Sequence, residues 1–159
     1  MTKIYFLVGS LVLVSLAPGG RAEENSDVSK AGASAVRSGQ HDFDALIGEW
    51  KYHLKRRLHP LTGSSNWVEF DGTGVCSKVW DGRAQMDTIV VDGPTGHLEG
   101  LTLRWYNPEA HQWGLYWANS KDGKVVPPQI GEFKNRRGEF YAQDMLDGKS
   151  IFVRLFGRI

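Results

Sequence analysis

The sequence predicts an all-β domain, an antiparallel meander that closes into a barrel. From residue 49 onward, apolar and polar side chains alternate with a period of two, which is typical of half-buried strands. Turn residues (Gly, Asn, Asp and Pro) separate these runs at intervals of roughly 8–16 residues. No long helical pattern interrupts them, and parallel strands would need such crossovers. A meander of this size hides its edges by closing into a barrel, and a two-sheet sandwich is the alternative.

The first 40 residues precede this pattern and predict an exported protein. Residues 1–22 are typical of a signal peptide, with Lys3 before an apolar run (residues 4–17) and Gly20-Arg21-Ala22 at the cleavage site. The run has 14 residues, whereas a membrane span needs about 20. Residues 23–40 are rich in Ser, Ala, Gly and charge, so we expect a disordered leader. The folded domain is then 41–159, in the periplasm or secreted.

A short helical turn over residues 41–47 is expected to open this domain, with Asp42 as a plausible cap. Phe43, Leu46 and Ile47 would then plug one end of the barrel. Trp50 follows as the first inward residue of a strand over residues 49–59, in which Tyr52, Leu54, Arg56 and Leu58 share its face.

Further strands are expected along the rest of the chain. The second is bent at the glycines of Asp71-Gly72-Thr73-Gly74, and Asp81-Gly82, Asp122-Gly123 and Asp147-Gly148 are turn signals. The expected strands cover residues 67–80, 84–91, 97–106, 111–118, 130–134, 139–143 and 151–158. The sequence stops within an apolar strand, so we expect a C-terminally truncated fragment that lacks one or two closing strands; alternatively, the eighth strand is the last.

Several motifs along residues 41–159 carry a family resemblance. They are Phe43-Asp44-x-Leu46-x-Gly48-x-Trp50, Gly72-Thr73-Gly74-Val75-Cys76, Trp80-Asp81-Gly82-Arg83, Leu103-Arg104-Trp105-Tyr106-Asn107-Pro108, Gln112-Trp113 and Ile130-Gly131-Glu132-Phe133. In this order they resemble bacterial exported lipocalin-like domains of unknown function, within the wider calycin barrels. The resemblance implies a small exported barrel with an internal cavity and no established activity. Related haem-binding barrels carry Gly-x-Trp-x-Gly near the start and a haem-ligating histidine near the end. Here Lys51-Tyr52 follows Trp50 and the last histidine is His111, so no haem is expected. The resemblance implies no other cofactor.

Charge and motif content narrow the possible functions. Without residues 1–22 the chain has 17 basic and 18 acidic residues, a net charge of −1. We therefore expect no nucleic-acid partner and no membrane contact after signal cleavage. The five histidines lack metal-ligand spacing, so no metal site is expected. Cys76 is the only cysteine, which excludes an internal disulfide, and we expect it to be buried in a strand. No Gly-x-Ser-x-Gly nucleophile motif occurs.

Polar residues at inward positions are the candidates for a site. Four charged side chains are expected to point into the barrel or to rim it: Arg56, Arg104, Glu132 and Arg154. In one interpretation an arginine and the glutamate pair with each other and plug one end of the barrel. In the other, one of the arginines faces a ligand's carboxylate or phosphate. Trp105, Trp113 and Trp117 supply ring surface for a ligand or plain core. The predicted ligand-binding set is Arg56, Arg104, Trp113, Tyr116, Glu132 and Arg154.

These observations favour binding of a small, partly apolar molecule in the barrel cavity, without catalysis. One alternative is an enzyme, an isomerase or hydrolase with Glu132 or His111 as general base, which requires a carboxylate or histidine with a perturbed pKa in the pocket. The other is a structural or interaction module with a filled barrel and an exposed apolar patch.

Overall fold

The computed structural model describes residues 38–158, which form one eight-stranded sheet. The predicted signal peptide (1–22) and all but the last three residues of the predicted leader (23–40) lie outside the described residues, as does Ile159. The strands are β1 (Gly48–Arg57), β2 (Trp67–Val79), β3 (Ala84–Gly93), β4 (Gly96–Asn107), β5 (Gln112–Asn119), β6 (Gln129–Lys134), β7 (Arg137–Leu146) and β8 (Lys149–Arg158).

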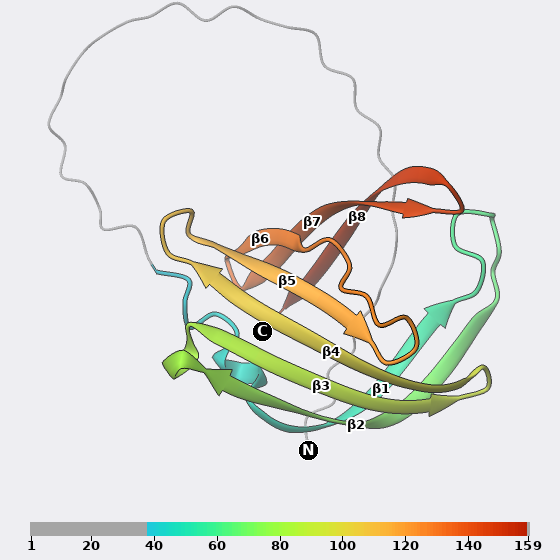
Figure 1. The fold of residues 1–159 in the computed structure, drawn as a ribbon, viewed down its shortest axis with the longest axis horizontal. Helices are drawn as coiled ribbons and strands as arrows, with labels where there is room; N and C mark the ends of the chain where they lie inside the picture. Colours follow the sequence, from blue (N-terminus) through green and yellow to red (C-terminus); the bar gives the residue numbers. More distant parts are fainter. Residues whose placement is uncertain (1–37, 159) are drawn as a thin grey trace, which may run out of the picture.

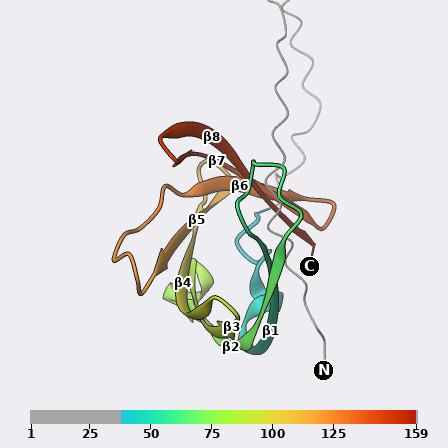
Figure 2. The same cartoon turned by 90° about the vertical axis from the view of Figure 1, so that its right-hand side faces the viewer.

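Each strand pairs antiparallel with the next one in the chain, so the strand order is β1 to β8 without a crossover. The sheet curls on itself into a half-barrel (Figures 1 and 2). The predicted all-β antiparallel meander is therefore confirmed. Among the described residues β1 and β8 do not pair with each other, and the closed barrel stays a prediction. No helix in residues 38–158 has the length and apolarity needed to cross a bilayer.

The two 3-10 turns lie at the same end of the half-barrel (Figure 1). They are η1 (Asp44–Leu46), which precedes β1, and η2 (Trp80–Gly82), which joins β2 to β3. In η2 the backbones of Trp80 and Asp81 are both left-handed, with φ of 51° and 55°. These positive φ angles turn the chain from β2 back into the antiparallel β3, with Val79 opposite Ala84, so the hairpin expected at Asp81-Gly82 is present.

The core lies where the segment before β1 packs into this end. Phe43 sits among aromatic rings, with centroid distances of 5.1 Å to Trp113 and 4.9 Å to Phe133. Main-chain groups hold the segment in place, because Trp113 Nε1 donates to the Gly39 carbonyl oxygen at 3.0 Å. Trp50 Nε1 likewise donates to the Leu46 carbonyl oxygen at 2.5 Å. The buried cluster contains Phe43, Leu46, Cys76, Tyr106, Trp113, Leu115 and Phe140.

We expect Phe140→Ala to lower the free energy of unfolding by about 3–5 kcal/mol, because the ring is 1% exposed and its removal leaves a cavity. The matched control is Phe152→Ala on β8, whose ring is 68% exposed; it should change stability by no more than about 0.5 kcal/mol. Urea unfolding followed by circular dichroism measures both. Equal losses for the two variants would place the core elsewhere.

Candidate functional site

A cavity of about 330 Å³ lies inside the curl of the sheet. Residues from η1, β1, β3, β4, β5, β6 and β8 line it, so the sheet wraps around it. Its apolar lining consists of Phe43, Leu46, Leu54, Ile89, Leu115, Trp117 and Leu155. Its polar lining consists of Tyr52, Asp87, Thr102, Arg104 and Gln129. The volume falls within the range of about 300–1,000 Å³ found for small-molecule sites.

Strand alternation places the lining residues. On β4, Thr102 and Arg104 face the cavity, whereas Leu101 before them and Trp105 after them are exposed on the other face. Further along the same face is Gly100, where an added Cβ would collide with the Trp117 ring. Glycine at this position therefore lets the indole of β5 lie across β4. This close approach puts a flat aromatic surface on the cavity wall.

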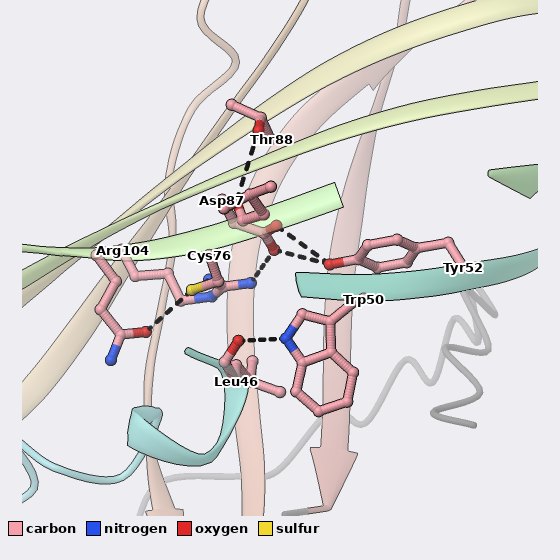
Figure 3. A network of polar contacts seen from close by, with 9 residues as sticks. Leu46, Trp50, Tyr52, Cys76, Asp87, Thr88 and Arg104 are labelled. Atoms are coloured by element: carbon pink, nitrogen blue, oxygen red, sulfur yellow. Dashed lines mark hydrogen bonds and ion pairs between the residues drawn. The ribbon is translucent and has the colours of Figure 1, made fainter. Parts of the chain in front are cut away.

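Arg104 and Asp87 form a buried ion pair on the polar side of the cavity. Arg104 Nη2 donates to Asp87 Oδ2 at 2.6 Å, and both side chains are 8% exposed. The Tyr52 hydroxyl, from β1, donates to Asp87 Oδ1 at 3.1 Å (Figure 3). A buried carboxylate is tolerated when it is both paired and hydrogen-bonded, and Asp87 meets both conditions.

Two further contacts hold the guanidinium of Arg104. Its Nη1 lies 3.5 Å from the Cys76 sulfur, on β2, and its Cζ lies 5.1 Å from the centre of the Phe43 ring. The latter distance is typical of a cation–π contact. Arg104 therefore ties the plug segment before β1 to three strands, β2, β3 and β4, on the polar side of the cavity.

Burial favours the neutral forms of the Tyr52 phenol and the Cys76 thiol beside the ion pair. Desolvation and the adjacent Asp87 carboxylate raise the pKa of Tyr52 above its ordinary value of 10.0. Desolvation likewise raises the pKa of the Cys76 thiol above 9.0, although Arg104 acts in the opposite direction. At neutral pH Tyr52 is thus a hydrogen-bond donor and Cys76 a thiol. The sequence predicted a buried Cys76, and its side chain is 2% exposed.

The structure brings one residue of the predicted ligand-binding set, Arg104, to the cavity. Trp113 is buried in the core cluster beneath Phe43 and does not line the cavity. Arg56 is exposed near the end of β1. Tyr116 lies on the outer face, where it lines a surface depression with Trp105 and Ile130.

Glu132 and Arg154 also face outward. Their neighbours Phe133 and Leu155 take the interior positions on β6 and β8, so the inward orientation expected for both charges is not what the structure shows. Glu132 pairs with Lys134 at 2.9 Å, and Arg154 pairs with Glu139 at 2.8 Å.

An outer charge cluster surrounds Glu139 on β7. Hydrogen bonds from Tyr141, Arg154 and Arg137 lower the pKa of its carboxyl to about 2. Its three partners come from β7 and β8, on the opposite side of the sheet from Phe140. The Arg–Glu pairing expected from the sequence therefore occurs with a different glutamate, and it lies outside the cavity.

The polar cavity residues that sequence reasoning missed are Asp87, Tyr52, Thr102 and Gln129. A signal was present for Asp87, because aspartate is depleted in strand interiors, and Asp87 lies in the apolar run Ala84–Val91 on the same face as Ile89. Tyr52 was placed on the inward face with Trp50, but no role was predicted for it. Within residues 38–158 no three His, Cys, Asp or Glu side chains gather as they would around a metal ion.

No protein-family model matches this chain, and a search of curated proteins found no relative. The resemblance of the motifs to bacterial lipocalin-like domains therefore stays a prediction.

We expect the ion pair to show strong coupling. Asp87→Leu alone should lower the free energy of unfolding by about 3–5 kcal/mol, because it leaves the Arg104 charge buried without a partner. The double variant Asp87→Leu/Arg104→Met, with no charge left at the site, should lose less than Asp87→Leu alone. Urea unfolding of the two single variants and the double variant measures the coupling. Losses that simply add would mean that the two charges act independently.

The raised pKa of Tyr52 predicts a loss of stability at alkaline pH. The folded chain holds the phenol proton more tightly than the unfolded chain, so this contribution is complete below the ordinary pKa of 10.0 and is lost as the pH rises beyond it. Tyr52→Phe should be less stable than the wild type at pH 7, because the hydrogen bond to Asp87 is gone. The gap, meaning the difference in free energy of unfolding between the wild type and the variant, should narrow above about pH 10.

Urea midpoints across the alkaline range measure that gap. Tyr141→Phe is the control, since the Tyr141 hydroxyl donates to Glu139 at 2.6 Å but the side chain is exposed, and its gap should narrow less. A gap that stays constant for Tyr52→Phe would contradict the role assigned to burial.

Proposed function

We propose that the protein binds a small, partly apolar molecule in the internal cavity and carries out no reaction on it. The cavity itself carries the proposal, because a pocket of about 330 Å³ with mostly apolar walls and a few converging polar groups is typical of ligand sites. Trp117 and Leu54 offer the apolar contact surface, and Thr102 and Gln129 offer hydrogen-bonding groups.

The state of the cavity's charged groups supports binding rather than catalysis. A general base must be free to accept a proton from the substrate, whereas Asp87 is already held by Arg104 and Tyr52. The two bases considered from the sequence lie elsewhere: Glu132 pairs with Lys134 on the outer face, and His111 lies beside the Tyr106 hydroxyl, outside the cavity lining. The isomerase or hydrolase alternative thus has less support.

The proposal also includes a closed lipocalin-like barrel and export of the protein from the cytoplasm. In a lipocalin-like barrel the sheet would curl further, until β1 and β8 pair with each other or with a strand between them. The alternation of more and less buried residues on β2 and β7 supports this. The export signal is the peptide over residues 1–22, and the partner is a small molecule. The motifs from Phe43 to Phe133 support the family resemblance.

A second candidate, an interaction module, is favoured by the outer face of the sheet. Met86 on β3 and Leu101 and Trp105 on β4 are exposed there, and Met86 lies opposite Leu103, which lies opposite Tyr116. Exposed apolar surface of this kind is common at protein–protein contacts. The cavity is open, however, whereas this alternative was expected to have a filled barrel.

Titration with the uncharged dye N-phenyl-1-naphthylamine, whose emission rises in apolar surroundings, tests the proposal. Leu54→Trp narrows the cavity and should weaken dye binding at least about tenfold. Leu101→Trp makes the same kind of change on the outer face and should leave binding unchanged. The reverse pattern would favour the outer face, and a mature protein that binds no small molecule by fluorescence or native mass spectrometry would overturn the proposal.

A further inference from the structure

We propose that the cavity selects uncharged ligands: apolar molecules that carry a hydroxyl, carbonyl or ester group, and not carboxylates, sulfonates or phosphates. This inference rests on the proposed function, because it concerns the ligand of the same cavity. It also reverses the interpretation suggested by the sequence, in which an arginine faces a ligand's carboxylate or phosphate.

The charge balance of the cavity lining carries the first step. Arg104 is the only cation that lines the cavity in residues 38–158, and Asp87 the only anion. They lie 2.6 Å apart and are both 8% exposed, so each neutralises the other in a place that water barely reaches. An anionic ligand would add a third charge and leave one negative charge uncompensated. Burial of an unpaired charge is far more costly than burial of a neutral polar group.

The second step is that Arg104 is held and cannot easily turn to a ligand. Asp87 binds one terminal nitrogen, the Cys76 sulfur lies 3.5 Å from the other, and the Phe43 ring faces the guanidinium at 5.1 Å. If Arg104 moved to an anion in the cavity, Asp87 would lose its cation and keep only the hydrogen bond from Tyr52. The ion pair is therefore a closed part of the cavity wall, and Arg104 is not available as a binding site for an anion.

The third step concerns the uncharged polar groups that remain. Thr102 lies directly opposite Asp87 in the β3–β4 register, and Gln129 lines the cavity from β6. Within residues 38–158 neither side chain makes a hydrogen bond to another residue. A hydroxyl and an amide can bond a ligand's hydroxyl, carbonyl or ester oxygen without adding charge. The apolar part of such a ligand would lie against Trp117, Leu54 and Leu155.

A matched pair of dyes tests the inference on the wild-type protein. N-phenyl-1-naphthylamine and 1-anilinonaphthalene-8-sulfonate share the same rings and differ by one sulfonate. We expect the sulfonate to bind at least about tenfold more weakly. In competition against the uncharged dye, 1-octanol should likewise displace it at lower concentration than octanoate. If the two anions bind as tightly as their uncharged counterparts or more tightly, the selection for uncharged ligands is overturned but the proposed function is not. If neither dye binds, the proposed function is overturned and this inference with it.

A charge-changing variant gives an independent readout. Asp87→Asn leaves the charge of Arg104 unbalanced, so the preference should shift toward the sulfonate dye by about tenfold or more. Asp87→Leu/Arg104→Met restores a net charge of zero at the site and should keep the preference for the uncharged dye. Circular dichroism shows whether Asp87→Asn folds; if it does not, the wild type and the double variant decide. A folded Asp87→Asn with an unchanged preference would contradict the inference.

Discussion

The buried pair between Arg104 and Asp87 constrains the rest of the structure. A guanidinium inside the sheet must find compensation from every side, and here it receives a carboxylate from β3, a thiol from β2 and an aromatic face from the segment before β1. Tyr52 of β1 closes the arrangement on Asp87. Four consecutive strands and the plug are therefore fixed relative to one another at a single place, on the polar side of the cavity.

The sequence was sufficient to predict the strands but not how the sheet ends. Alternation and turn residues are local signals, and they gave the meander correctly because each strand pairs with its neighbour in the chain. Closure depends instead on contacts between the first and last strands, for which no local pattern exists. The faces of β6 and β8 were ambiguous for a related reason. Apolar residues occur there at both parities, as with Phe152 beside Val153, so a shift by one residue leaves an equally apolar face.

The candidate site was predicted through Trp117, as possible ring surface, and through Arg104. Its pairing with Asp87 could not be read from the sequence because the two residues lie 17 positions apart on different strands, and their contact depends on the β3–β4 register. The expectation that an arginine pairs with glutamate was right in kind, since Arg154 binds Glu139. The expected place, inside the barrel, was wrong. Long charged side chains form such pairs more easily on an exposed face, where little desolvation is needed. A short aspartate inside an apolar strand was the more informative signal.

The plug gives the half-barrel two unlike ends. At one end, Gly39 is hydrogen-bonded to Tyr106 and Trp113, and the Phe43 ring packs against other aromatic rings. At the opposite end lie only the connections β1–β2, β3–β4, β5–β6 and β7–β8 (Figure 1). A ligand bound as proposed would contact residues of the strands and of the plug, and not these connections. For a ligand that enters past this rim, substitutions in residues 58–66 or 120–128 would change the rate of exchange and leave the ion pair untouched.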